Sequence, residues 1–98
     1  MRVSITERQG LFNMEQFEYQ ITDEIGIHAR PAGLFVKEAS KYSSAVQISC
    51  NGKKGDGKSI FGIMGLGAAK GDTITVSVEG ADEKEAAKEI EKFLKDNL

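Results

Sequence analysis

Three stretches of the chain alternate apolar with polar residues, which is the pattern of a β-strand with one buried face. They cover residues 15–22, 46–50 and 74–78. The pair Asn51-Gly52 directly follows the second stretch and favours a tight hairpin, because both residues accept a positive φ. The pattern therefore predicts strands in these stretches and one more short strand at about 53–56, joined to the second by the hairpin.

A helical spacing of apolar residues begins just after His28. Ala32, Phe35, Ala39 and Tyr42 recur at steps of three and four, which is the stripe of an amphipathic helix. We therefore expect a helix that starts within a residue of His28 and continues to about Tyr42.

Two more helices are predicted in the second half of the chain. The first should run from Ser59 to about Leu66 and be short, because two glycines within it weaken it. The second follows Asp82 and carries a long apolar stripe. At its start, Asp82 and Glu85 have the spacing of a capping box, in which the two side chains accept hydrogen bonds from the first backbone amides of the helix.

The predicted order of elements is βαββαβα. Each strand has one wet and one covered face, and each helix has one apolar stripe to bury. Three helices packed on one face of a four-stranded antiparallel sheet satisfy both requirements, so we predict an α+β open-faced β-sandwich. This domain should span residues 14–98. Residues 1–13 show no sustained period and are predicted to be a flexible N-terminal extension.

Length, charge and cysteine content limit the kinds of function that this chain can have. A chain of 98 residues supports one domain, and a net charge of −2 gives no electrostatic footprint for nucleic acid. No apolar run is long enough for a membrane span, so we expect neither nucleic acid nor a membrane as a partner. The single cysteine, Cys50, excludes an internal disulfide and does not support a cysteine metal site. We expect a cytoplasmic protein without a bound metal or cofactor.

The most distinctive residue is His28, the only histidine of the chain. The first amides of a helix have no partner within the helix and together carry about half a positive charge, which suits a phosphate. This charge, together with Arg30, favours the neutral and nucleophilic form of the imidazole. A neutral ring nitrogen can attack a phosphoryl donor. The plainer alternative is that His28 caps the helix or lies idle on the surface.

One motif match is rejected. The segment 52–59, GKKGDGKS, fits the nucleotide-binding P-loop pattern letter for letter. A P-loop requires a parallel sheet with crossover helices and an acidic magnesium ligand at the end of a second strand. The Asn51-Gly52 hairpin is incompatible with the first requirement, and no such ligand follows the strand at 74–78. We therefore expect no nucleotide site here.

Two segments together match a known pattern. The first is GIHARPA, from Gly26 to Ala32, and the second is GKSIFGIMGL, from Gly57 to Leu66. In their order and separation they resemble the active-site signature and the regulatory-serine segment of HPr, the histidine phosphocarrier of the bacterial sugar phosphotransferase system, in its Gram-positive form. The resemblance covers about residues 14–98. It implies the same open-faced fold and a phosphocarrier rather than an enzyme.

For His28 the resemblance implies phosphorylation by enzyme I, the phosphoenolpyruvate-dependent kinase, and transfer onward to the IIA domains of sugar permeases. Arg30 would neutralise the transferring phosphoryl group, and the backbone amides of Ala29 and Arg30 would bind its oxygens. We expect the chain to be a monomer.

For Ser59 the resemblance implies phosphorylation by a bifunctional HPr kinase/phosphorylase, which would make the chain a carbon-catabolite regulator that binds a catabolite-control transcription regulator. From the sequence alone Ser59 is a helix N-cap, and the two roles are compatible. Ile60, Phe61 and Met64 are the expected partner-binding residues, although apolar residues of this kind are more often found in a core.

Two other functions stay open. One is a regulatory binding module that acts only through Ser59 and the surface of the second helix, as relatives of HPr without the histidine do. The presence of both His28 and Arg30 argues against it. The other is a small α/β module with an unrelated ligand, since a fold does not by itself determine a function.

Overall fold

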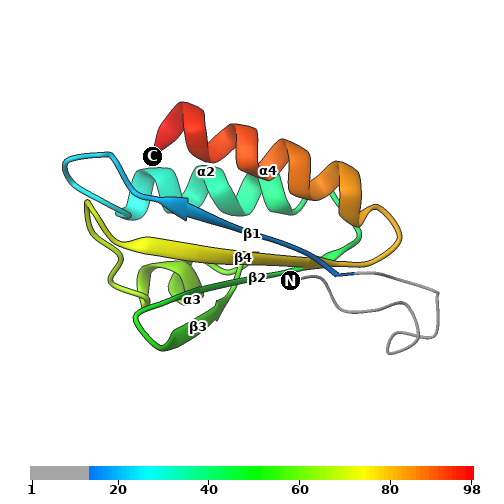
Figure 1. Ribbon diagram of the computed structural model, residues 1–98, viewed down its shortest axis with the longest axis horizontal. Coiled ribbons are helices and arrows are strands. Elements are labelled where there is room, and N and C mark those ends of the chain that lie inside the picture. Colours follow the sequence, from blue (N-terminus) through cyan, green and yellow to red (C-terminus); the bar gives the residue numbers. More distant parts are fainter. Residues whose placement is uncertain (1–13) are drawn as a thin grey trace.

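The computed structural model describes residues 14–98, and the predicted extension of residues 1–13 lies outside the described residues. Figure 1 shows a sheet with two long helices lying side by side along it. In chain order the elements are β1 (Glu15–Gln20), α2 (Ala29–Ala39), β2 (Ala45–Cys50), β3 (Lys53–Asp56), α3 (Ile60–Met64), β4 (Thr73–Glu79) and α4 (Glu83–Asn97). The predicted βαββαβα order is confirmed.

The strands form one four-stranded antiparallel sheet in the order β1-β4-β2-β3. Because β4 lies between β1 and β2, Val76 is paired with Phe17 on one side and with Ile48 on the other. The next row of residues faces the opposite way, since side chains alternate along a strand. Its members are Glu18, Thr75 and Ser49. One face of the sheet is therefore apolar and the other polar.

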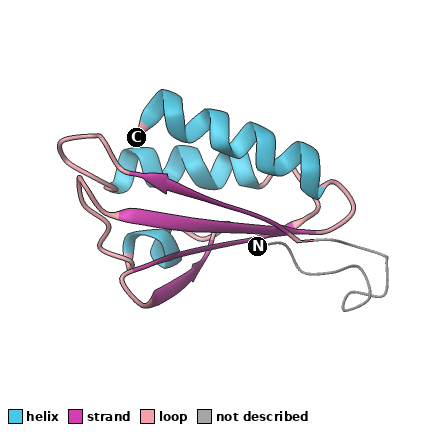
Figure 2. Cartoon of the chain, in the orientation of Figure 1, coloured by secondary structure: helices cyan, strands magenta, loops and turns pink. Residues whose placement is uncertain are grey.

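The helices of the described chain all bury side chains in the core on the apolar face. Figure 2 shows α2 and α4 along one side of the sheet, where Phe35 and Phe93 meet edge to face with ring centroids 6.0 Å apart. Ile63 of α3 and Ile90 of α4 are buried in the same core as Val76. The predicted α+β fold, an antiparallel sheet covered by helices, is confirmed.

Two helices are shorter than their sequence pattern predicts. α2 ends at Ala39 instead of Tyr42, and α3 ends at Met64 instead of Leu66. The first amide beyond each end still bonds four residues back, and the next two bond to carbonyl oxygens three residues back, as the amide of Tyr42 does with Ala39 at 3.3 Å. Such tight turns keep the apolar residues pointing inward while the α-helix itself has stopped.

The predicted capping box at Asp82 and Glu85 is wrong. Asp82 occupies the N-cap position of α4, but its side chain makes no capping hydrogen bond. The carboxylate instead accepts hydrogen bonds from the loop before β2: from the amides of Ser43 and Ser44, at 3.0 Å each, and from the Ser44 hydroxyl. Ser44 is completely buried, so Asp82 satisfies polar groups that water does not reach. The bonds tie the start of α4 to the start of β2.

Replacing Asp82 by Asn tests this tie. The hydrogen bonds, with that from the Ser44 hydroxyl first, lower the pKa of the Asp82 carboxyl. A carboxyl whose pKa falls on folding stabilises the fold above its unfolded pKa of about 3.9, and the stabilisation is lost as the pH falls through the folded pKa. We expect Asp82→Asn to lower the thermal unfolding midpoint at neutral pH, and the difference from wild type to shrink in acid.

The control is Glu18→Gln, which removes an exposed carboxylate on β1 that forms no hydrogen bond or ion pair within residues 14–98. Its unfolding midpoint should follow that of the wild type. A deficit of Asp82→Asn that is equally large at neutral and at acid pH would contradict the assignment to the carboxylate.

Candidate functional site

His28 occupies the N-cap position of α2. Its backbone is extended, with φ −133° and ψ −176°, and its carbonyl oxygen accepts a helical hydrogen bond from the amide of Ala32 at 3.0 Å. The imidazole is half-buried and makes no capping hydrogen bond. The alternative in which this side chain caps the helix is therefore wrong, and the ring nitrogens are available for chemistry.

The backbone next to His28 offers hydrogen-bond donors. Ala29 and Arg30 are the first residues of α2, so their amides have no carbonyl partner within the helix. Pro31 follows without an N–H group, which costs nothing here because a donor at that position would also have lacked a partner. α2 has 11 residues and adds the positive end of its dipole at this point. The surroundings of His28 therefore favour an anion.

The loop before His28 is held against the loop that leads into β4. The amide of Ile27 donates to the carbonyl oxygen of Ala68 at 3.0 Å. Gly26 has a φ of +79°, and a Cβ at this position would lie 2.8 Å from the Ala68 oxygen and from the Ala69 Cα. Only glycine fits this backbone without a shift of the neighbouring loop. Two contacts therefore fix the chain immediately before the histidine.

Arg30 is exposed in the first turn of α2. The ion pairs within residues 14–98 are Lys41–Glu38 at 3.0 Å and Lys70–Glu24 at 3.2 Å, and neither uses Arg30. A guanidinium without an acidic partner retains its donors for an incoming anion, which it can bind through two parallel hydrogen bonds.

Ser59 is the N-cap of α3 and is half-buried. Its Oγ accepts a hydrogen bond from the amide of Gly62 at 3.2 Å, which confirms the predicted N-cap role. The neighbouring Lys58 donates from Nζ to the carbonyl oxygen of Tyr42 at 2.8 Å and ties this turn to the chain beyond α2. Because α3 has only five residues, it depends on such ties more than a long helix would.

The expected partner-binding residues lie at the surface. Phe61 is 88% exposed, Met64 41% and Ile60 40%, whereas Ile63 is buried in the core. A phenyl ring this exposed contributes little to the stability of the fold. The expectation that Phe61 and Met64 are accessible is confirmed, while their binding role stays a prediction.

The structure adds two exposed apolar residues that sequence reasoning missed, Leu34 and Ile25. Leu34 lies off the stripe that α2 buries, so its exposure was readable from helical spacing. Ile25 lies in a loop, where no periodicity exists to reveal its exposure.

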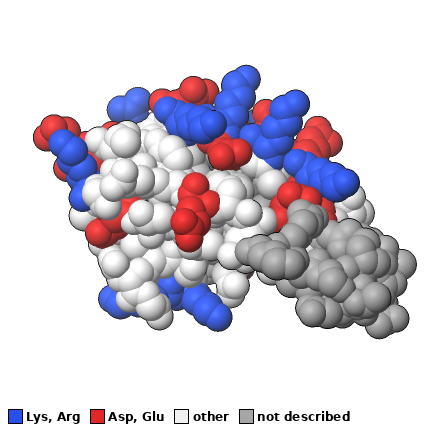
Figure 3. All heavy atoms as spheres, viewed as in Figure 1, with Lys and Arg blue, Asp and Glu red and all other residues white. Residues whose placement is uncertain are grey.

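Charged side chains gather along the edge of the molecule that α4 forms (Figure 3).

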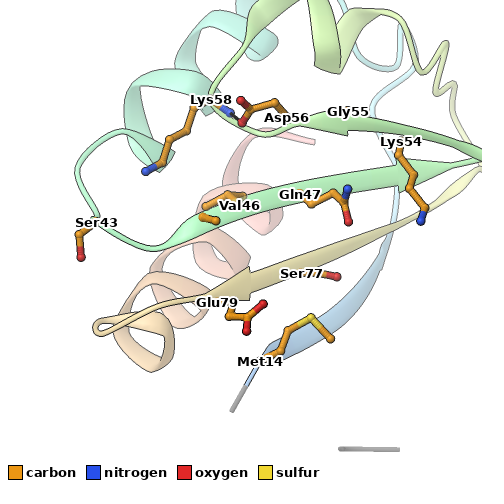
Figure 4. Close-up of a pocket in the computed structure, with 11 residues that line it drawn as sticks. Met14, Ser43, Val46, Gln47, Lys54, Gly55, Asp56, Lys58, Ser77 and Glu79 are labelled. Carbon is orange, nitrogen blue, oxygen red and sulfur yellow. Dashed lines mark hydrogen bonds between the residues drawn. The ribbon is translucent and has the colours of Figure 1, made fainter. Parts of the chain in front are cut away.

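A hollow of about 740 Å³ lies on the polar face of the sheet, where side chains of β2, β3 and β4 line it (Figure 4). Its lining includes charges of both signs, among them Lys54, Asp56 and Glu79, and excludes both His28 and Ser59. The rejected P-loop segment passes along it as a strand paired antiparallel with β2, so the parallel geometry of a nucleotide site is not formed. The hollow is separate from the candidate site.

Other potential nucleophiles are poorly suited to phosphoryl chemistry. Burial raises the pKa of the Cys50 thiol, with a smaller effect from the charge of Asp72. Burial, followed by the charge of Glu38 and a hydrogen bond to it, raises the pKa of Tyr42 to about 12. Both groups stay protonated at neutral pH. Within residues 14–98 no cluster of three or more His, Cys, Asp or Glu side chains could hold a metal, and no helix is long and apolar enough to cross a membrane.

Known proteins match this chain over nearly its whole described length. A family model for the HPr component of the phosphotransferase system, centred on its phosphorylation site, matches residues 15–96. The chain belongs to the HPr family. HPr proteins are phosphocarriers of that system and not enzymes, as predicted.

Solved structures of HPr proteins share the fold and much of the sequence. The histidine-containing phosphocarrier protein of a Mycoplasma is 40% identical with a TM-score of 0.81, over 84% of this chain and 93% of that one. An HPr from Thermoanaerobacter tengcongensis is 42% identical with a TM-score of 0.78, over 83% and 91%. Crh, the catabolite repression HPr of Bacillus subtilis, is 35% identical with a TM-score of 0.69, over 82% and 92%. Crh and the Thermoanaerobacter HPr also form dimers in some structures, so the expected monomer stays a prediction.

Alanine at Gly26 should damage the site, and alanine at Gly52 is the matched control. Both glycines have left-handed backbones, with φ of +79° and +80°, but a Cβ at Gly52 meets no atom within 4 Å. Each substitution carries a strain of about 1–2 kcal/mol from the backbone alone. Gly26→Ala must in addition displace the chain at Ala68.

We therefore expect Gly26→Ala to lower the thermal unfolding midpoint more than Gly52→Ala does, and to slow phosphorylation of the chain by enzyme I. Gly52→Ala should lose stability only. Equal transfer rates for the two variants would show that the contact between the loops does not position the site.

Proposed function

We propose that His28 is the phosphoryl acceptor of this HPr-family chain. Enzyme I phosphorylates it, and the phosphorylated protein passes the group to the IIA domains of sugar permeases. The observation that carries the proposal is an imidazole without a capping bond at the N-terminus of α2, next to the unpartnered amides of Ala29 and Arg30. A protein with this function is expected to be cytoplasmic.

The residues around His28 have distinct parts in the transfer. A neutral imidazole nitrogen attacks the phosphorus atom, so that a P–N bond forms while the bond from phosphorus to the donor breaks. The guanidinium of Arg30 and the amides of Ala29 and Arg30 stabilise the negative charge on the phosphoryl oxygens. A phosphorylated imidazole is a good leaving group, which suits a carrier that must hand the group on.

Intact mass measurement after incubation with phosphoenolpyruvate, magnesium and enzyme I tests the acceptor. The wild type should gain one phosphoryl group, and the group should be lost in mild acid because it is bound to nitrogen. His28→Ala should gain none and still fold, since the imidazole makes no capping bond. Ser59→Ala should behave as the wild type. Phosphorylation of His28→Ala, or an acid-stable product in the wild type, would refute the proposal.

We propose in addition that Ser59 is a regulatory phosphorylation site for an HPr kinase/phosphorylase. The similarity to Crh, a catabolite repression HPr, supports this second role. A phosphoserine adds about −1.5 to −2 charges beside the exposed Phe61 and Met64. A partner that presents apolar or acidic groups there then binds less well, and one that presents Arg or Lys, such as a catabolite-control transcription regulator, binds better. A chain that acted only in this way, as a binding module, would leave His28 unphosphorylated.

Aspartate at Ser59 should imitate part of this effect. We expect Ser59→Asp to be phosphorylated on His28 by enzyme I several-fold more slowly than the wild type, chiefly through a higher KM. Gln16→Glu, which adds one negative charge to an exposed side chain of β1 on the polar face, is the control and should keep the wild-type rate. Equal rates for Ser59→Asp and the wild type, with the same result for authentic phosphoserine, would rule out the switch.

A further inference from the structure

The uncharged segment that contains α3 extends beyond Ile60, Phe61 and Met64. No charged residue occurs from Ser59 to Ala69. The exposed members of this segment are Ile60, Phe61, Met64, Gly65, Gly67 and Ala69. The exposed residues after Met64 are glycine and alanine, so the segment adds no charge up to the loop that enters β4. Exposed large apolar residues that gather on one segment are typical of a protein interaction site.

The loop that leads to His28 lies next to the end of this segment. Figure 1 shows the loop after β1 beside the loop before β4, at the same end of the molecule. The amide of Gly71 donates to the carbonyl oxygen of Ile21 at 2.9 Å, and that of Ile27 donates to Ala68 at 3.0 Å. An ion pair between Lys70 and Glu24, 3.2 Å long, joins the loops at their tips. Along the chain, Ile25 lies between Glu24 of the ion pair and Ile27, which bonds to Ala68.

Ile25 is 71% exposed, although it is a large apolar residue at the tip of a turn. Asp23 holds the turn through two hydrogen bonds: the amide of Ile25 donates to Asp23 Oδ1 at 2.9 Å, and the amide of Gly26 donates to the Asp23 carbonyl oxygen at 3.0 Å. A turn tip is usually polar, and this side chain adds little to the core. Its fixed position outside the core suits a contact with another protein, because little conformational entropy is lost when it binds.

We propose that Ile25 is a specificity residue for enzyme I, whose surface would receive the side chain in an apolar pocket next to the site that receives His28. This inference rests on the proposed function of His28. Ile25 precedes His28 by three positions, whereas Ser59 is the N-cap of α3 and Phe61 lies within that helix. A partner that brings a phosphoryl group to the imidazole must cover the surface around it, and Ile25 is a large exposed apolar residue in the loop that leads to the histidine. A kinase that acts on Ser59 has no need to reach Ile25.

Steady-state kinetics of phosphorylation by enzyme I, with phosphoenolpyruvate and magnesium, tests the proposal on the full chain. Ile25→Ser removes the apolar contact, and Ile25→Leu retains it. We expect Ile25→Ser to raise the KM of enzyme I for the protein by about tenfold, as for one of the minority of interface side chains that carry most of the binding energy, with kcat unchanged. Ile25→Leu should restore most of the affinity. The thermal unfolding midpoint and the rate of Ser59 phosphorylation by HPr kinase/phosphorylase should stay at their wild-type values for both variants.

Equal KM values for the wild type and Ile25→Ser would overturn this inference and leave the proposed function of His28 intact. A higher KM accompanied by a lower unfolding midpoint, or by a parallel loss of Ser59 phosphorylation, would also overturn it, because Ile25 would then act through the fold. Failure of the wild type to be phosphorylated on His28 at all would refute the proposed function itself, and the inference with it.

Discussion

The antiparallel pairing of β1 with β4 determines where the functional segments meet. In the observed register Gln20, the last residue of β1, lies opposite Thr73, the first residue of β4. The loop that leaves β1 and the loop that enters β4 therefore start from adjacent points and remain in contact as far as the hydrogen bond between Ile27 and Ala68. The first loop leads into His28, and the second comes from α3. One strand pairing thus brings the histidine loop and the α3 segment to a common surface.

The same register also determines which side chains of the sheet enter the core. A shift of one residue would turn Phe17 and Tyr19 away from the helices and bring Glu18 into the core in their place. A shift that misplaced the site would therefore bury the charge of Glu18. The free energy that this burial costs is larger than the free energy that the loop contacts contribute. This coupling explains how a small domain keeps an exposed loop in a defined position without a disulfide. The pairing of the strands determines where the loop before His28 lies, and the contacts of the loop residues determine its detailed conformation.

The sequence predicts the local features of this fold well and the contacts between distant segments poorly. The alternation in β4 and the stripe of α2 are properties of neighbouring residues, so both elements and the N-cap position of His28 could be predicted. The partners of Asp82 lie 38 and 39 residues away, and local spacing suggested Glu85 instead. The exposure of Ile25 depends on a turn that hydrogen bonds to Asp23 hold, and no periodicity encodes it.

His28 and Ser59 are the N-caps of two different helices, so a modification of Ser59 would have to act on His28 across the surface between them. α2 and α3 are in contact, and Lys58 ties the turn before α3 to Tyr42, so the two sites belong to helices that are packed together. If Ser59 is modified as proposed, no movement of the backbone is needed for regulation. The added charge acts directly on whatever protein covers α3, and solvent ions screen it beyond about 8–10 Å. Partners whose contact area includes Ser59, as proposed for enzyme I, would therefore respond, while a partner whose contact area stops short of α3 would be largely unaffected. A single phosphate at the start of α3 would in this way discriminate among partners by how much of α3 they cover.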